Sequence, residues 1–127
     1  MVFDGLLEFI VLNYSGKVVE VGSGSFFKVA IELQKKGFDV TCTDIRDIKA
    51  PKGIKFVIDD INSPTLEIYK GSSLIYSIRP PSELFEAIRS LSRKVGADCI
   101  IKSLPDEIPE NFSLINHKGD FFYLSRF

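Results

Sequence analysis

Apolar and polar positions alternate along the chain with two different spacings, and each change of spacing marks the start of a new expected element. Near the start, apolar residues recur every three or four positions, which predicts an amphipathic helix over the first fourteen residues, ending near Ser15 and Gly16. The β-branched run at residues 17–21 then predicts a strand. Helical spacing returns from Phe26 and stops near Gly37, a residue type that favours helix ends.

Four further strands are predicted beyond this second helix. Each is a short apolar or β-branched run, and together they cover residues 39–45, 54–61, 73–78 and 97–104. Strands that alternate with helices indicate a parallel sheet with right-handed crossovers. The expected fold class is therefore α/β, a doubly wound, mostly parallel Rossmann-like sheet, and residues 1–127 are expected to form a single domain.

Two later helices are also expected. Ser63 is suited to an N-cap, with Pro64 at the first helical position, which predicts a short helix over residues 63–69. A longer helix opens at Pro81 or Ser82 and carries its apolar residues on one face. These helices would connect the later strands of the sheet.

The end of the chain lacks a helix that could cover the sheet. Residues 105–111 contain two prolines, so they cannot hold a full helix, and residues 112–116 and 120–127 predict a C-terminal antiparallel hairpin. Because parallel strands are apolar on both sides, one face of the sheet should then be poorly covered. We expect an exposed apolar patch formed by Leu104, Ile108, Phe112, Phe121 and Tyr123.

This patch predicts a homodimer in which a second copy buries the apolar side chains. A protein partner is one alternative, and cover by loops and by the aliphatic stems of lysines and arginines is another. Multi-angle light scattering at micromolar concentration measures the mass in solution. A result of monomer alone would contradict the homodimer.

Composition and charge narrow the classes of function. The 127 residues include 16 Lys and Arg against 17 Asp and Glu, a formal net charge of -1, which makes nucleic acid an unlikely partner. The start of the chain carries Asp4 and Glu8 and shows no basic leader or membrane-length apolar span, which indicates a cytoplasmic protein. Cys42 and Cys99 lie far apart and His117 is the single histidine, so neither a disulfide nor a metal site is expected.

The segment "VVEVGSGSFF" carries the main candidate chemistry. A glycine-containing turn between a strand and a helix places unpaired N–H groups and the helix dipole beside a ligand. Gly22, Ser23 and Gly24 form this turn. Glu20 precedes it at a position that dinucleotide-binding turns normally fill with an apolar side chain, and Phe27 replaces the third glycine of G-x-G-x-x-G.

Acidic residues follow the next two predicted strands. Asp44 and Ile45 end the second strand, about twenty residues after the glycines, where a carboxylate can accept hydrogen bonds from ribose hydroxyls. Asp59 and Asp60 end the third strand and are placed to reach an adenine. Because ligands of open α/β sheets bind at the carboxyl ends of the strands, these residues predict a nucleotide-type site. The alternative is that each acid is an ordinary capping carboxylate.

Together, "VEVGSGS", "TDI" and "IDDI" resemble the first three motifs of class I S-adenosylmethionine-dependent methyltransferases. The whole chain is also similar to a small uncharacterised archaeal family of Rossmann-like proteins, a likeness carried mainly by "SLIYSIRPP". The chain departs from the extended first motif at Phe26, where a third glycine is usual. The resemblance implies that the methionine end of the cofactor is held by Glu20, Gly22 and Gly24, the ribose by Asp44, and the adenine by Asp59 or Asp60.

The fourth predicted strand ends in "SIRPP", which places Ser77, Arg79 and Pro80 beside the same site as candidate substrate-binding residues. Amino-group methyltransferases resemble this segment but carry Asn or Asp where Arg79 stands. A guanidinium only donates hydrogen bonds, so Arg79 suits a phosphate or carboxylate. The alternative is an ion pair between Arg79 and one of the three aspartates. Arg46 adds another alternative, because an arginine there can meet the 2′-phosphate of an NADP-type cofactor.

Three functions from different classes follow from these residues. The first is a minimal methyltransferase-like domain that binds S-adenosylmethionine and transfers its methyl group to a small or partner-delivered acceptor. The second is a non-catalytic nucleotide-binding or protein-interaction module, and the third is an NAD(P)-binding domain. Glu20 favours the first over the third, whereas the lack of a substrate-recognition domain favours the second over the first. Binding of S-adenosylmethionine is the working hypothesis, with catalysis left open.

Overall fold

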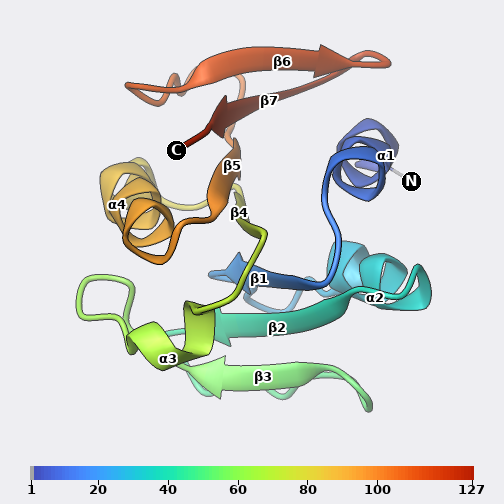
Figure 1. The fold of residues 1–127 in the computed structure, drawn as a ribbon, viewed down its shortest axis with the longest axis vertical. Coiled ribbons are helices and arrows are strands. Elements are labelled where there is room, and N and C mark those ends of the chain that lie inside the picture. The colour runs from blue at the N-terminus through green and yellow to red at the C-terminus, as the bar shows by residue number, and fades with distance from the viewer. Residues whose placement is uncertain (1) are drawn as a thin grey trace.

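In the computed structural model, which describes residues 2–127, a seven-stranded sheet carries helices on both faces (Figure 1). The strands are β1 (Lys17–Val21), β2 (Asp39–Asp44), β3 (Lys55–Ile58), β4 (Leu74–Ile78), β5 (Asp98–Lys102), β6 (Ser113–His117) and β7 (Asp120–Ser125). The helices are α1 (Asp4–Asn13), α2 (Lys28–Lys35), α3 (Leu66–Tyr69) and α4 (Phe85–Val95), the last preceded by the 3-10 turn η1 (Ser82–Leu84).

The strand directions confirm the expected fold class. The order across the sheet is β3-β2-β1-β4-β5-β7-β6, and β1 to β5 all run parallel. β7 pairs antiparallel with β5, and β6 pairs antiparallel with β7, so the C-terminal hairpin extends the parallel sheet as predicted. The chain moves outward from β1 to β3 and then returns to β4 on the other side of β1. The switch point of the sheet therefore lies between β1 and β4.

Two apolar clusters fill the space between the sheet and its helices. The first lies beneath α1 and α2 and includes Leu6, Ile10 and Leu33, which are fully buried. The second lies beneath α3 and α4 and includes Tyr69 and Ile88. In Figure 1, α1 and α2 lie on one side of the strands and α4 on the opposite side. Both sides of the central parallel strands are thus covered, as strands with two apolar faces require.

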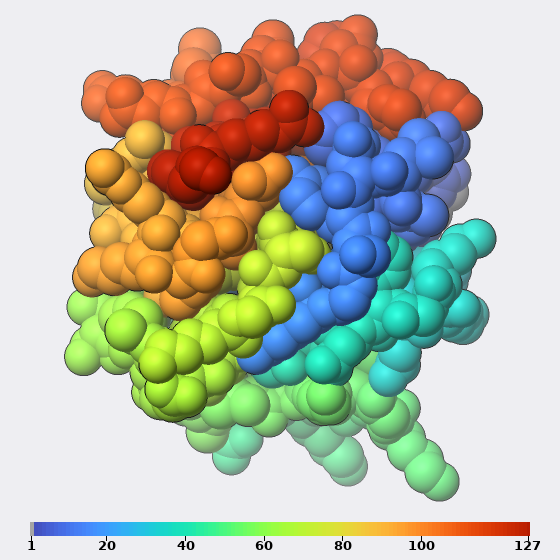
Figure 2. Space-filling view, in the orientation of Figure 1, coloured from blue at the N-terminus to red at the C-terminus, as the bar shows by residue number. Residues whose placement is uncertain are grey.

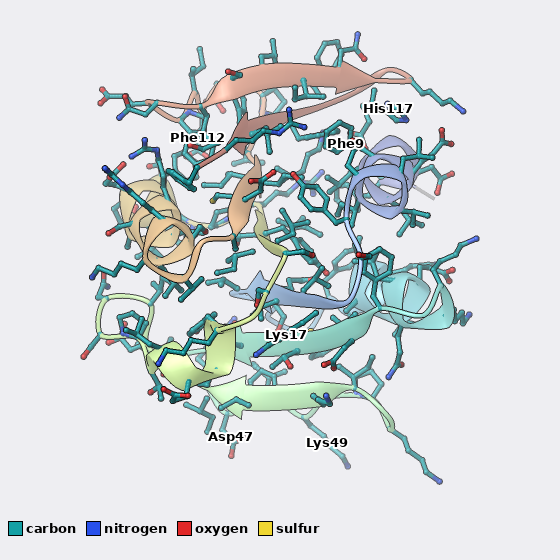
Figure 3. All side chains as sticks on the ribbon, in the orientation of Figure 1. Phe9, Lys17, Asp47, Lys49, Phe112 and His117 are labelled. Carbon is teal, nitrogen blue, oxygen red and sulfur yellow. The ribbon has the colours of Figure 1, made fainter. Side chains whose placement is uncertain are left out.

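α1 packs against the hairpin and covers one face of it. The Leu6 N–H donates to Asp120 Oδ2 at 2.8 Å, and Lys102 Nζ donates to Asp120 Oδ1 at 2.7 Å. Phe9 and His117 lie together at this contact, with ring centroids 5.7 Å apart (Figure 3). The N-terminal helix therefore takes, on this face, the place of the helix that is missing after β5.

The predicted apolar patch is present in part. Leu104, Ile108 and Phe121 are exposed, Ile108 by 73%. Phe112 and Tyr123 are half-buried, and Phe112 packs against the cluster beneath α4 (Figure 3). The hairpin forms one end of the molecule (Figure 2). Burial of this patch by a second copy or a protein partner stays a prediction.

Several elements are shorter than predicted, and two of them, α2 and β3, bear on the position of the candidate residues. α2 begins at Lys28, because the Phe26 N–H donates to the Ser23 carbonyl and continues the turn. Phe26 is consequently 41% exposed instead of facing the core. β3 ends at Ile58, so the acids expected at the end of this strand follow it instead.

The start of α3 also differs from the prediction. Ser63 and Pro64 precede the helix, and Thr65 is its N-cap without a capping hydrogen bond from its own side chain. The Asp59 carboxylate instead accepts the Thr65 N–H at 3.2 Å from either oxygen. A carboxylate six positions earlier, outside the helix, therefore supports the residue at which the helix begins, and the usual N-cap pattern of Ser63 and Pro64 does not predict it.

Candidate functional site

A crevice of about 440 Å³ lies at the carboxyl ends of β1 to β4, across the switch point of the sheet. It is lined by eight of the residues predicted from the sequence: Gly22, Asp44, Ile45, Asp59, Asp60, Ser77, Arg79 and Pro80. Glu20, Ser23 and Gly24 do not line it. The topology thus gathers residues from four strand ends into one cavity of the size that small-molecule ligands occupy.

The glycine turn folds onto the end of β2. Gly22 and Gly24 have φ angles of 68° and 53°, the left-handed region that glycine adopts without strain. The N–H groups of Gly22 and Ser23 donate to the Thr43 carbonyl at 2.8 and 3.1 Å, and the Gly24 N–H donates to Asp44 Oδ2 at 2.9 Å. The N–H groups of this turn therefore hold the strand end, and Gly22 alone of the three turn residues meets the crevice.

Asp44 is a buried carboxylate that Arg46 covers. Besides the Gly24 N–H, it accepts the Arg46 N–H at 3.0 Å and Arg46 Nε at 3.1 Å. Burial raises the pKa of Asp44, but the hydrogen bonds from Arg46 and Gly24 outweigh burial and hold the pKa below its ordinary value. The Arg46 side chain is 67% exposed, so it can leave Asp44 at small cost. Asp44 then becomes an ionised acceptor at the wall of the crevice.

Asp59 and Asp60 differ in how far the fold uses them. Asp59 accepts the Tyr69 hydroxyl at 2.7 Å as well as the Thr65 N–H, so it ties α3 to the end of β3. Asp60 Oδ1 accepts the Asn62 N–H at 2.9 Å in a local turn. Among the described residues, Asp60 Oδ2 has no hydrogen-bond partner. Asp60 is therefore the better placed of the two to accept a hydrogen bond from a ligand.

Glu20 lies in the core, on the face of the sheet that α2 covers. It is 1% exposed and stands in register between Cys42 on β2 and Tyr76 on β4. In the described chain, Glu20 Oε1 and the Tyr76 hydroxyl are both buried and make no hydrogen bond of ordinary geometry, but Tyr76 lies close enough to oppose in part the rise in the Glu20 pKa. Burial raises the pKa of Glu20 to about 8, because it disfavours the charged form. A buried acid thus carries an unsatisfied oxygen two residues before the glycine turn.

Ser77 is fully buried, and its hydroxyl ties β4 to β1. Its Oγ donates to the Val21 carbonyl at 2.6 Å. The hydroxyl proton is therefore already engaged, and Ser77 could meet a ligand only as an acceptor. Its neighbour Pro80 is also buried and gives the crevice a rigid wall.

Arg79 stands at the crevice with an unusual backbone. Its φ angle is 52°, and its N–H donates to the Lys102 carbonyl at 2.6 Å. The guanidinium lies over the Phe3 ring, 5.4 Å from the ring centroid. Within residues 2–127 it makes no ion pair, so the alternative that pairs Arg79 with one of the aspartates is wrong.

The apolar wall of the crevice was not predicted from the sequence. Ile61, Leu84 and Ile88 line it, together with Thr43 and Asn62. Leu84 and Ile88 are four positions apart at the start of the helical segment after β4, so one helical face points to the crevice. From the sequence alone, that spacing indicates a helical face in the core. Only the sheet topology shows that the first turn of this helical segment faces the crevice.

Three further observations on the described residues concern the cysteines, the side chains that could bind a metal ion, and the helices that could span a membrane. Cys42 and Cys99 are free and buried, and burial raises the pKa of both thiols. Over residues 2–127, no three His, Cys, Asp or Glu side chains gather as ligands of a metal ion would. None of the helices there is long and apolar enough to cross a bilayer.

Comparison with known protein structures identifies the fold. An S-adenosyl-L-methionine methyl transferase from Silicibacter pomeroyi superposes with a TM-score of 0.67 at 17% identity, over 96% of this chain and 90% of its own. An S-adenosyl-L-methionine-dependent methyltransferase from Methanococcus maripaludis, described as putative, gives a TM-score of 0.66 at 16% identity, over 98% and 85% of the two chains. At these identities the likeness shows a shared fold, and the expected methyltransferase-like architecture is confirmed.

Comparison of sequences identifies the family. The model of an uncharacterised protein family, UPF0146, matches residues 3–127. A UPF0146 protein of the archaeon Archaeoglobus fulgidus is 52% identical over 121 residues, which is 95% of this chain and 92% of the relative. The resemblance to a small archaeal family of Rossmann-like proteins is therefore confirmed. The chain belongs to the UPF0146 family and has the fold of S-adenosylmethionine-dependent methyltransferases.

Proposed function

We propose that this chain binds S-adenosylmethionine in the crevice at the switch point, as a methyltransferase-like domain that acts in the cytoplasm. The observation that carries the proposal is the convergence of the Gly22 turn, Asp44 and Asp60 on one cavity. A cavity of about 440 Å³ is within the range that small-molecule sites occupy. The shared fold of solved methyltransferases supports the same ligand class.

The residues present fit an adenosyl cofactor. Asp44 would accept hydrogen bonds from the ribose hydroxyls once Arg46 moves aside, and Asp60 Oδ2 would accept one from the adenine amino group. Ile45, which is 65% exposed, and the buried Ile61 give apolar surface for the adenine ring.

The methionine end would lie on the side of the glycine turn. Gly22 lines the crevice there and presents no side chain to a ligand. Ser23 and Gly24 shape the turn, whereas Glu20 lies in the core on the α2 face of the sheet and does not line the crevice. Ser77, Arg79 and Pro80 would form the acceptor side. Both ends of such a ligand thus have residues of suitable chemistry within the same strand-end region.

When bound, S-adenosylmethionine supplies an electrophilic methyl group. The contribution of this chain would be to position the acceptor and to exclude water, because methyl transfer depends mainly on placement. The described acceptor side carries no free base: the Ser77 proton is engaged, Arg79 stays protonated, and Asp59 accepts the Tyr69 hydroxyl. The acceptor would therefore arrive deprotonated or release its proton to water or to Asp60, whose Oδ2 is unpartnered at the same crevice among the described residues.

One observation favours the non-catalytic alternative. The N–H groups of the glycine turn and both oxygens of Asp44 are already bonded within the chain. A domain that kept the fold but lost its ligand would show the same internal bonding. It would then act through a protein partner, for which the exposed part of the predicted apolar patch, Leu104, Ile108 and Phe121, is the candidate surface.

Replacement of Asp44 by alanine should abolish or strongly weaken ligand binding. The ribose would lose its acceptor, which costs about 1–3 kcal/mol of binding free energy. Each 1.4 kcal/mol of this cost lowers the affinity roughly tenfold. Isothermal titration calorimetry against S-adenosylmethionine, S-adenosylhomocysteine, NAD and NADP measures both the selectivity and the change. We expect the two adenosyl-sulfur compounds alone to bind.

Arg46→Ala is the matched control. It removes the side chain that covers Asp44 but leaves the carboxylate, so affinity for S-adenosylhomocysteine should stay unchanged or increase. Unchanged affinity in Asp44→Ala would contradict the ribose assignment. Absence of binding by all four compounds would contradict the cofactor proposal and favour the partner-binding module. Selective binding of NADP, lost in Arg46→Ala, would favour the dinucleotide alternative.

A further inference from the structure

We propose that the crevice binds a small acceptor that carries a carboxylate or phosphate group, and that the Arg79 guanidinium holds this anionic group. The inference deepens the proposed function, since it names the acceptor class of the same site. Three features of the structure carry it: the unpaired charge of Arg79, the aromatic platform beneath it and the strained backbone that presents it.

The charges around the crevice leave Arg79 without a carboxylate. Three aspartates line the cavity, and each is engaged elsewhere: Asp44 with Arg46, Asp59 with Tyr69, and Asp60 with a local N–H group. Arg46, the other cation of the lining, is paired. Arg79 is therefore the cation of the described lining that can take a new anionic partner while Arg46 remains on Asp44.

The guanidinium of Arg79 is held in place although it is exposed. It stacks over Phe3, whose ring is 5% exposed and is itself contacted edge-on by Phe26, with ring centroids 5.5 Å apart. Stacking occupies the face of the guanidinium and leaves the N–H donors at its edge free. The side chain is thus ordered before a ligand arrives, which reduces the entropy cost of binding.

The backbone at Arg79 stores strain at the rim of the cavity. A left-handed φ of 52° is unfavourable for a non-glycine residue, and Arg79 also precedes a proline, which restricts it further. The hydrogen bond from its N–H to the Lys102 carbonyl and the buried Pro80 hold this conformation. Strain of this kind persists where the surroundings impose it, and it clusters at ligand sites.

The chemistry of the group defines the ligand. A guanidinium offers donors and no acceptor, so it binds carboxylate or phosphate oxygens through paired hydrogen bonds and repels an amine cation. Pro80, Pro81 and Leu84 line the adjoining wall with apolar, rigid surface. The acceptor is therefore small, with one anionic end at Arg79 and an apolar part against this wall.

Titration of the protein with inorganic phosphate and, separately, with acetate tests the inference directly. The probe is the NMR signal of the arginine Nε–Hε groups, assigned for Arg79 by the loss of its signal in Arg79→Gln. We expect a saturable shift of the Arg79 signal with at least one of the two anions. The anion that gives the stronger response identifies the class, phosphate or carboxylate.

Arg93→Gln is the matched control, because Arg93 is exposed on α4 and also lacks an ion pair within the described chain, but has no aromatic platform. The Arg79 response should persist in Arg93→Gln. Arg79→Lys keeps the charge but lacks the planar pair of donors. In a thermal-shift titration with the same anion, this variant should bind several-fold more weakly than the wild type. An Arg79 signal that does not shift, or that shifts no more than the Arg93 signal, would overturn the inference.

Repetition of the titration with S-adenosylhomocysteine separates this inference from the proposed function. An Arg79 response with no binding of S-adenosylhomocysteine would keep the anion site and reject the cofactor. Binding of S-adenosylhomocysteine with no Arg79 response would keep the cofactor and reject the anionic acceptor. The two results are read from different signals of the same sample.

Discussion

Replacement of Glu20 by glutamine should raise the free energy of unfolding substantially at pH 8 and change it little at pH 5. Glu20 is 1% exposed, and burial raises the pKa of its carboxyl from 4.5 to about 8. The native chain therefore keeps this proton over a pH range in which the unfolded chain has lost it. Glutamine is close in shape and carries no charge to desolvate.

The sign of the effect follows from proton binding. Between pH 4.5 and about 8 the native state binds more protons at Glu20 than the unfolded state, so stability falls as the pH rises through this window. Each pH unit costs about 1.4 kcal/mol, which amounts to roughly 4–5 kcal/mol across the window. As the pH rises, the free energy of unfolding of the wild type should fall below that of Glu20→Gln by this amount. The difference between the two proteins should level off above about pH 8.

Urea unfolding at pH 5, 6.5 and 8 measures the difference. Glu110→Gln, at an exposed glutamate, controls for the loss of one carboxyl from the chain. Equal pH dependence of wild type and Glu20→Gln would contradict the buried, protonated carboxyl.

The same variant reports on the cofactor site. The Glu20 side chain does not line the crevice, so a role at the methionine end would act through the position of the glycine turn that follows it. In that case Glu20→Gln should bind S-adenosylhomocysteine more weakly while unfolding at higher denaturant concentration. Such opposite changes are typical of a group retained for function at the expense of stability. A variant that is more stable and binds equally well would assign Glu20 no role in the site.

Replacement of Gly5 by alanine should destabilise the protein, although alanine ordinarily stabilises a helix. A Cβ at position 5 would overlap the Asp120 Cβ and the His117 carbonyl oxygen, because α1 packs there directly on the hairpin. The helix would have to move away, and the hydrogen bond from Leu6 N–H to Asp120 would lengthen. Overpacking of this kind costs about 1–3 kcal/mol, against a gain of about 0.5–1 kcal/mol from the better helix former.

Thermal unfolding of Gly5→Ala measures the net effect as a lower Tm. Leu12→Ala is the matched control, because Leu12 lies in the same helix and is 67% exposed. It should change the Tm little. A Tm of Gly5→Ala equal to or above that of the wild type would show that α1 does not pack on the hairpin as described.

The elements of the fold could be predicted because their signals are local. The β-branched run before Gly22 and the apolar spacing after β4 each fix an element within a few residues. The boundaries failed where a single hydrogen bond outside the helix decides them. Asp59 sets the start of α3 through the Thr65 N–H, and a bond between Phe26 and Ser23 delays α2.

The candidate site divides in the same way. Asp44 and Asp60 could be predicted as lining residues, because the carboxyl ends of parallel strands meet at one edge of a sheet. The face of the sheet to which Glu20 belongs and the aromatic partner of Arg79 could not. Glu20 faces the α2 side instead of the crevice, and Arg79 rests on Phe3, which is 76 positions earlier in the chain and comes near only because α1 packs across the sheet.

The sequence by itself determined the α/β class, the order of strands and helices, the C-terminal hairpin and the family resemblance, because spacing, turn residues and short motifs act over a few positions. Only the tertiary structure decided that α1 covers the hairpin, that Arg46 covers Asp44 and that Arg79 stays unpaired. These outcomes depend on which side chains compete for one partner in space. That competition is settled by distance and burial in the folded chain, even for Asp44 and Arg46, which are two positions apart, and one sequence contains no local signal for its outcome.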